Sequence, residues 1–113
     1  MRKEPGQRLM EQLSYAHPGK ALLEDFLTPL DLSCSAIARA TGVPSRHINE
    51  IIHGKRRITA DTAIRLASAL GTSARYWLIL QADHDLAIAL RLFDTSFHQV
   101  EPVAVSQRFY NGV

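Results

Sequence analysis

The stretch GVPSRHINEIIHGKRRIT, residues 42–59, decides how this chain should fold. It begins with a glycine and ends, after a second glycine, on three consecutive cations and a short Ile-Thr step. Between the glycines, Ile48, Ile51 and Ile52 recur at helical spacing, so one face of the segment is apolar. The other faces carry hydrogen-bonding side chains. The segment therefore predicts a short amphipathic helix with a polar outer face and a basic end.

A second short helix precedes this one, and together they predict a helix-turn-helix motif. Ser33 is a good N-cap for a helix over residues 34–41, and Gly42 ends that helix because glycine adopts a left-handed backbone at little cost. Ala38 is small where the next helix must pass close, and Pro44 suits the first turn of that next helix. Proteins with this motif commonly place the second helix in the major groove of DNA.

The remainder of the chain predicts an all-α fold, a five-helix bundle of the Cro/repressor-like helix-turn-helix type with flexible terminal extensions. The first helix is indicated by an apolar stripe of Leu22, Leu23, Phe26, Leu27 and Leu30. Thr59 should cap the fourth helix, which Gly71 follows, and Ser73 should cap the fifth. The fifth helix is either continuous or broken near residues 82–85.

The chain has 113 residues, which favours a single domain. We expect an N-terminal extension over 1–16, the helix-turn-helix domain over 17–93 and a C-terminal tail over 94–113. The tail shows a faint strand-like alternation of apolar and polar residues. Because Pro102 has no N–H to donate, we expect this segment to be an edge strand or a loop. No apolar run approaches the roughly 20 residues that cross a bilayer. A single cysteine excludes an internal disulfide and fits the reducing cytoplasm.

The net charge is only +2, but the cations are concentrated around the helix-turn-helix segment. Residues 39–65 hold six cations and two anions, whereas residues 66–113 hold three cations and four anions. Such a local excess is what a protein that binds a polyanion needs, although charge also clusters by chance.

The polar face of the third helix predicts contacts with DNA bases. Arg46 and Glu50 lie opposite the isoleucines when residues advance by about 100° each along the helix. Arginine pairs with guanine, asparagine with adenine, and glutamate accepts from cytosine N4. The expected base-reading residues are Ser45, Arg46, His47, Asn49 and Glu50. The alternative is a solvated helix face.

A second group of residues predicts contacts with the DNA backbone. Cations that follow the groove-reading helix are placed to bind phosphates, and the start of the second helix can present backbone N–H groups. The expected phosphate-binding residues are Ser33, Ser35, Lys55, Arg56 and Arg57. The alternative for the cation run is a solubilising loop.

An enzyme is the competing class of function, because five histidines suggest a small nuclease. His47 and His53 are six residues apart and do not share the face that a helical metal pair needs, so we expect no metal, no cofactor and no catalytic site. Cys34, near a helix start, is either a reactive thiol or a small packing residue.

Three segments resemble the HigA-type antitoxins of the XRE/Cro-like helix-turn-helix class: HPGKALLEDFL (17–27), GVPSRHINEIIHGKRRITADTAIRLASALGTS (42–73) and YWLILQADHDL (76–86). The resemblance implies a homodimer that binds double-stranded operator DNA upstream of its own operon. It also implies a protein partner, a HigB-type toxin of the RelE-like mRNA endonuclease group. A stand-alone repressor without a toxin is the alternative.

Two partner surfaces are also expected. The fifth helix has more large apolar residues than one core-facing side needs, so the predicted dimer interface is Trp77, Leu78, Leu80, Leu86 and Leu90. For the toxin, the favoured surface is residues 1–30, where Glu24 and Asp25, together with Asp31 directly after this range, form an acidic edge that suits a basic partner. The alternative is the tail, where Val100, Val103 and Val105 could add a strand to a partner sheet.

Overall fold

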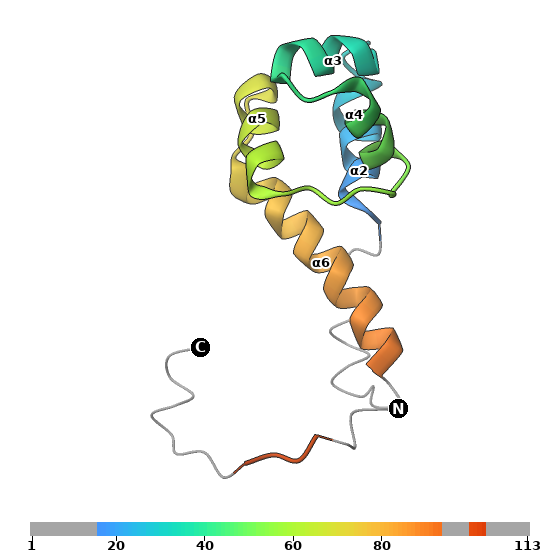
Figure 1. Ribbon diagram of the computed structural model, residues 1–113, viewed down its shortest axis with the longest axis vertical. Helices are drawn as coiled ribbons and strands as arrows, with labels where there is room; N and C mark the ends of the chain where they lie inside the picture. Colours follow the sequence, from blue (N-terminus) through green and yellow to red (C-terminus); the bar gives the residue numbers. More distant parts are fainter. Residues whose placement is uncertain (1–15, 94–99, 104–113) are drawn as a thin grey trace.

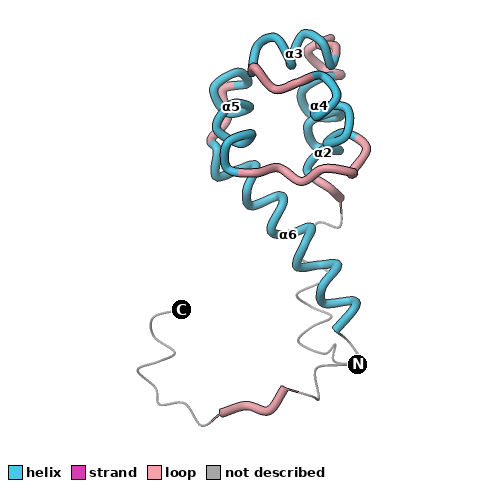
Figure 2. The backbone as a smooth tube through the Cα atoms, in the orientation of Figure 1, coloured by secondary structure: helices cyan, strands magenta, loops and turns pink. Residues whose placement is uncertain are grey.

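The computed structural model describes residues 16–93 and 100–103, and Figure 1 shows a helical bundle from which the last helix extends. The elements are α2 (Pro18–Ala21), which continues directly into the π-helical turn η1 (Leu22–Leu27), α3 (Cys34–Thr41), α4 (Ser45–Ile52), α5 (Ala60–Leu70) and α6 (Ala74–Phe93). Because α2 and η1 form one helical segment, the described residues contain five helices, as predicted, and the predicted all-α fold is confirmed. No strand occurs in the described ranges (Figure 2), so Val100 and Val103 lie in irregular backbone. Val105 falls outside those ranges.

The first helix widens where the sequence predicts a regular apolar stripe. From Leu22 onward the turn is π-helical, and the Thr28 N–H donates to the Leu23 carbonyl five residues earlier, at 2.9 Å. The wider turn buries Leu22 and Leu27, also five residues apart, whereas Leu23 and Leu30 are exposed. The stripe predicted from Leu22 to Leu30 therefore enters the core only in part.

Hydroxyl caps begin three of the helices, as predicted. The side chains of Ser33, Thr59 and Ser73 each accept a hydrogen bond from the backbone N–H three residues further along, at 3.0, 3.4 and 3.0 Å. Pro44 differs slightly from the expectation, because it is the N-cap residue of α4 and not part of its first turn.

Helix α6 is continuous from Ala74 to Phe93, which answers the question of a break near residues 82–85. Its first part packs into the bundle through Trp77 and Gln81, which are almost fully buried. Its last turns extend away from the other helices, as Figure 1 shows, and Leu92 is largely exposed.

The core draws large side chains from every helix and from the loop before α5. Its largest fully buried apolar members are Leu22, Leu27, Ile37, Ile48, Ile51, Ile58, Leu66 and Trp77. The Trp77 indole N–H donates to the Thr72 hydroxyl at 2.8 Å, so this large ring is buried with its polar atom satisfied. Two members, Ile48 and Ile51, belong to α4, and their burial fixes which side of α4 faces outward.

Gly19 lets α2 lie directly against the backbone of α4. A Cβ atom at this position would overlap the Ile51 carbonyl and would lie 2.9 Å from Ile52 Cα. Because the obstructing atoms are backbone, no side-chain rotation can relieve the clash. Gly19 is itself buried, so the two helices contact each other without an intervening side chain.

We expect Gly19→Ala to lower the free energy of unfolding by about 2 kcal/mol or more, because the methyl group must displace α4. Chemical denaturation followed by circular dichroism measures the change. Lys20→Ala, at the exposed neighbouring position of the same helix, is the matched control and should change stability by less than about 0.5 kcal/mol. Equal stability of the two variants would show that α2 does not contact α4 in this way.

Candidate nucleic-acid interface

The turn between α3 and α4 is stabilised by Thr41, a buried residue at the end of α3. Its hydroxyl donates to the Ile37 carbonyl at 2.7 Å and accepts from the Val43 N–H at 3.2 Å. Gly42, the next residue, has φ 77°, a left-handed conformation that glycine adopts without strain. The turn that the sequence predicts from Gly42 is therefore also stabilised by the hydrogen bonds of Thr41.

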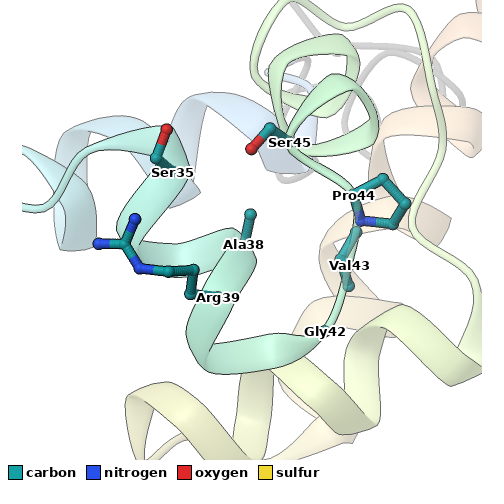
Figure 3. A pocket seen from close by; sticks show the side chains of 7 residues that line it. All are labelled: Ser35, Ala38, Arg39, Gly42, Val43, Pro44 and Ser45. Carbon is teal, nitrogen blue, oxygen red and sulfur yellow. The ribbon is translucent and has the colours of Figure 1, made fainter.

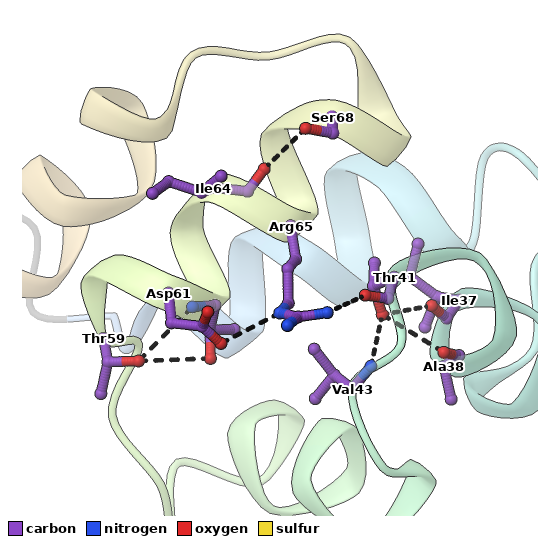
Figure 4. A network of polar contacts seen from close by, with 10 residues as sticks. Ile37, Ala38, Thr41, Val43, Thr59, Asp61, Ile64, Arg65 and Ser68 are labelled. Atoms are coloured by element: carbon purple, nitrogen blue, oxygen red, sulfur yellow. Dashed lines mark hydrogen bonds and ion pairs between the residues drawn. The ribbon is translucent and has the colours of Figure 1, made fainter.

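Arg65 of α5 connects this turn to the rest of the bundle (Figure 4). Its Nη1 donates to the Thr41 carbonyl at 3.0 Å, and its Nε donates to Asp61 Oδ2 at 3.0 Å. A Cβ at position 42 would lie 2.9 Å from Arg65 Nη1, so Gly42 also makes room for this guanidinium. Arg65 belongs to the basic excess in the sequence, but the structure uses it to hold the turn.

Helix α4 divides its residues between the core and the surface. Ile48 and Ile51 are completely buried, and Ile52 is partly buried. Of the five residues that the sequence predicts to read bases, three are exposed, Ser45, Arg46 and Asn49, and two are partly buried, His47 and Glu50. All five therefore lie on one short helix whose opposite side is anchored in the core.

A groove of about 430 Å³ separates the N-terminal part of α4 from α3. It is lined by Ser35, Ala38, Arg39, Gly42, Val43, Pro44 and Ser45. Figure 3 shows Ser35 and Arg39 on the α3 side and Ser45 at the start of α4, with Ala38 between them. The groove therefore brings together a predicted phosphate-binding residue, Ser35, and a predicted base-reading residue, Ser45. Sequence reasoning did not assign Arg39 a role, although its position four residues after Ser35 places both on one side of α3.

Ser33, the other serine predicted to bind phosphate, is the N-cap residue of α3. Its hydroxyl oxygen accepts from the Ala36 N–H, so the hydroxyl proton is what remains for a ligand.

The three cations after α4 have three different environments. Lys55 is exposed and forms no ion pair with any described residue. Arg56 donates from Nε to Glu50 Oε1 at 2.9 Å. Arg57 pairs with Asp85 of α6, at 2.9 Å between Nη2 and Oδ2. The predicted phosphate-binding run is therefore tied to α4 on one side and to α6 on the other.

Gln81 fixes the end of the same loop from inside the bundle. Its side-chain oxygen accepts from the buried Ile58 N–H at 2.7 Å, and its amide group donates to Asp85 Oδ1 at 3.0 Å. Sequence reasoning missed Gln81. Its position four residues after Trp77 places it on the same side of α6, which could have indicated that it is buried.

Glu50 is held as a carboxylate. The hydrogen bond from Arg56 lowers the pKa of Glu50 and outweighs desolvation, which raises it, while the nearby charges of Arg56, Arg46 and His47 lower it further. Glu50 can therefore act only as a hydrogen-bond acceptor near neutral pH.

The surface of α6 differs from the interface expected from sequence. Trp77 is completely buried within one chain, so it offers no surface to a second copy, and Leu80 packs partly against the core. Leu86 is exposed on the outward side of α6, and Leu90, one turn later, is partly buried. Ile79, seven residues before Leu86, lies on the same side of the helix, and Ile79 is 46% and Leu86 43% exposed. Leu78 is exposed on an adjacent side of the helix.

His17 caps α2 at a point where the first helix meets α6. Its Nδ1 accepts from the Gly19 N–H at 3.0 Å, and its ring packs edge-on against His84 with 5.0 Å between the ring centres. Burial lowers the pKa of His17. His84 and Arg57 lower it further, and Asp85 opposes them. A neutral imidazole is what the cap requires, because a protonated Nδ1 cannot accept a hydrogen bond.

We expect the stability of the protein to fall as the pH drops through about 6.5, the pKa of an unfolded histidine, because the unfolded chain then binds a proton more readily than the folded one. The pKa of His17 in the folded protein is lower than 6.5. Its contribution to stability is therefore fully present well above pH 6.5 and is lost as the pH falls from 6.5 toward the folded pKa. Thermal melting between pH 5 and 8 measures the effect. His17→Asn keeps a capping oxygen but cannot titrate, so its melting temperature should depend less on pH. The same pH dependence in both proteins would exclude His17 as a source.

No helix among the described residues is both long enough and apolar enough to span a membrane. The described residues also contain no group of three His, Cys, Asp or Glu side chains arranged to hold a metal ion.

Comparison with known proteins places this geometry among DNA-binding proteins. A helix-turn-helix family model matches residues 23–77. Virulence-associated protein I of Dichelobacter nodosus is 47% identical over 73 residues, which cover 65% of this chain and 68% of that protein. Antitoxin HigA-1 of Vibrio cholerae is 34% identical over 88 residues, 78% of this chain and 83% of that protein. The solved structure of Pseudomonas aeruginosa antitoxin HigA with the higBA promoter superposes with a TM-score of 0.76 at 38% identity, covering 80% of this chain and 100% of that one.

Proposed function

Because this chain belongs to the HigA-type antitoxins of the helix-turn-helix family, we propose that it represses its own operon by binding operator DNA and neutralises a HigB-type toxin by binding it. The observation that carries the first role is the orientation of α4. Ile48 and Ile51 anchor it in the core, and Arg46 and Asn49 point outward. The matching Pseudomonas aeruginosa structure is an antitoxin with its promoter, which supports the same role for this chain.

The residues proposed to contact DNA have two kinds of task. Ser45, Arg46, His47, Asn49 and Glu50 on α4 read base edges in the major groove. Ser33, Ser35, Lys55, Arg56 and Arg57 contact the phosphates on either side of it. Arg39 joins the second set, because it lines the groove between Ser35 and Ser45.

Arg46 and Lys55 should respond differently to truncation. Arg46→Ala should cost about 1–3 kcal/mol on the preferred operator and relax the preference at one base pair in each half-site. Lys55→Ala should weaken binding to all sequences alike and lower the slope of log K against log salt by about 0.9. Fluorescence anisotropy with operator and scrambled duplexes at several salt concentrations measures both. If Arg46→Ala weakens the two duplexes equally, Arg46 does not read a base.

We propose that two copies bind together, because one short helix contacts too few base pairs for useful selectivity. The outward side of α6 suits a second copy. Ile79 and Leu86 are seven residues apart and Leu90 follows one turn later, a spacing that allows two helices to pack along a common seam. A symmetric dimer would then place its α4 helices in half-sites about 34 Å apart.

Leu86→Glu should convert the dimer to a monomer at micromolar concentration, because two carboxylates would be buried at the seam. Light scattering measures the mass. Ile64→Glu, at an exposed apolar position of α5, is the matched control and should leave the mass unchanged. A wild-type protein that is monomeric under the same conditions would exclude the proposed seam.

For the toxin we propose the acidic surface of the first helix. Glu24 and Asp25 on η1 and Asp31 in the turn that follows it are exposed, and a toxin that acts on mRNA must present a basic surface. These residues lie outside α3, α4 and the cation run, so the protein could hold DNA and toxin together. Residues 1–15, also part of the expected surface, fall outside the described ranges.

Glu24→Lys combined with Asp25→Lys should abolish capture of the tagged protein encoded next to this gene, while operator binding is retained. Glu101→Lys reverses one acidic charge in the tail and should retain capture. Loss of capture only in the Glu101→Lys variant would move the contact to the tail. If the neighbouring reading frame encodes no toxin, the stand-alone repressor is the correct function.

A further inference from the structure

Glu50 and Arg56 form a direct pair across the end of α4. Arg56 Nε lies 2.9 Å from Glu50 Oε1, and the two side chains are 39% and 34% exposed. The sequence suggests separate tasks for them, base reading for Glu50 and phosphate binding for Arg56. In the structure, the two side chains share a hydrogen bond, which couples their positions.

The pair leaves both residues able to bind a ligand. Glu50 still has its second carboxylate oxygen, which can accept from the amino group of a base. Arg56 still has the N–H groups of its two terminal nitrogens, which can donate to a phosphate. One base and one neighbouring phosphate can therefore be contacted through a single ion pair.

The loop that carries Arg56 is attached at both ends. At its start, the Lys55 N–H donates to the Glu50 carbonyl at 2.8 Å. At its end, the buried Ile58 N–H donates to Gln81, and Arg57 pairs with Asp85. Arg56 lies between these attachments, which restricts it to the side of α4 that carries Glu50.

A positioned cation changes what Glu50 can do beside DNA. A lone carboxylate approaching the duplex is repelled by the phosphates and is free to rotate away from the base. A hydrogen-bonded guanidinium offsets that repulsion and holds the carboxylate in one orientation. Lys55 is also a cation, but it makes no such contact with any residue in the described ranges.

We propose that Arg56 is a positioning residue that orients the Glu50 carboxylate toward a base amino group, so that Arg56 determines sequence preference without itself touching the base. The proposal rests on the proposed function, in which α4 lies in the major groove. It assigns to Arg56 a different task from Lys55, its neighbour in the cation run. The base class is one with an amino donor in the major groove, cytosine or adenine.

The test is selection by the purified full-length protein from a randomised double-stranded DNA library, followed by affinities for each single base-pair variant of the selected sequence. At the base pair read by Glu50, the wild type should prefer one base by about five-fold or more. Glu50→Ala and Arg56→Ala should each largely remove this preference, and the double variant should remove no more than either alone. Lys55→Ala is the matched control, which should weaken binding to every duplex by the same factor and keep the preference.

The Arg56→Lys variant tests whether base preference needs the guanidinium held in position or only a positive charge. Lysine keeps the cation but lacks the planar guanidinium and its Nε donor, so general affinity should recover while the preference stays reduced. Circular dichroism of each variant establishes that it is folded.

Two results would overturn the inference. In the first, Arg56→Ala weakens all duplexes equally and keeps the full preference at every position, which would make Arg56 a phosphate contact alone. In the second, the effects of Glu50→Ala and Arg56→Ala add. A wild-type protein that selects no sequence would instead contradict the proposed function itself.

Discussion

Helix α4 rests on the backbone of α2, and the absence of a side chain at Gly19 is what permits this contact. A backbone contact is less adjustable than one between side chains, because no rotamer change can accommodate a shift. The burial of Ile48 and Ile51 acts with it and fixes the rotation of α4 about its own axis. The outward face of α4 is thus set by the fold before any ligand is present, which reduces the ordering cost of binding.

The basic charge around α4 is divided between structure and recognition. Arg65 holds the turn through the Thr41 carbonyl, and Arg57 holds the loop to α6 through Asp85. Arg56 is paired with Glu50, and Lys55 is exposed. A count of cations along the sequence indicates a region suited to a polyanion, but it overstates how many side chains are available to bind one. The geometry of each pair decides which of them can respond to DNA.

Features that depend on a few neighbouring residues could be predicted from the sequence. The caps at Ser33, Thr59 and Ser73, and the apolar face of α4, follow from hydrogen bonding and periodicity within one or two turns. Features that depend on tertiary contact could not. The burial of Gln81 arises because α6 packs against the loop before α5, and the π-helical turn has no signal in the spacing of the apolar residues around it. Trp77 illustrates the limit: the sequence shows a surplus of apolar residues on α6 but does not show which of them the chain buries itself.

Protection of guanine N7 from dimethyl sulfate tests most directly whether α4 lies in the major groove, because N7 is exposed only there. With the full-length protein on its selected duplex, we predict two protected clusters about one helical turn, ~10 base pairs, apart, with adenine N3 in the minor groove still reactive between them. Protection of minor-groove adenines without protection of guanine N7 would contradict the placement of α4. A single protected cluster would contradict the paired arrangement.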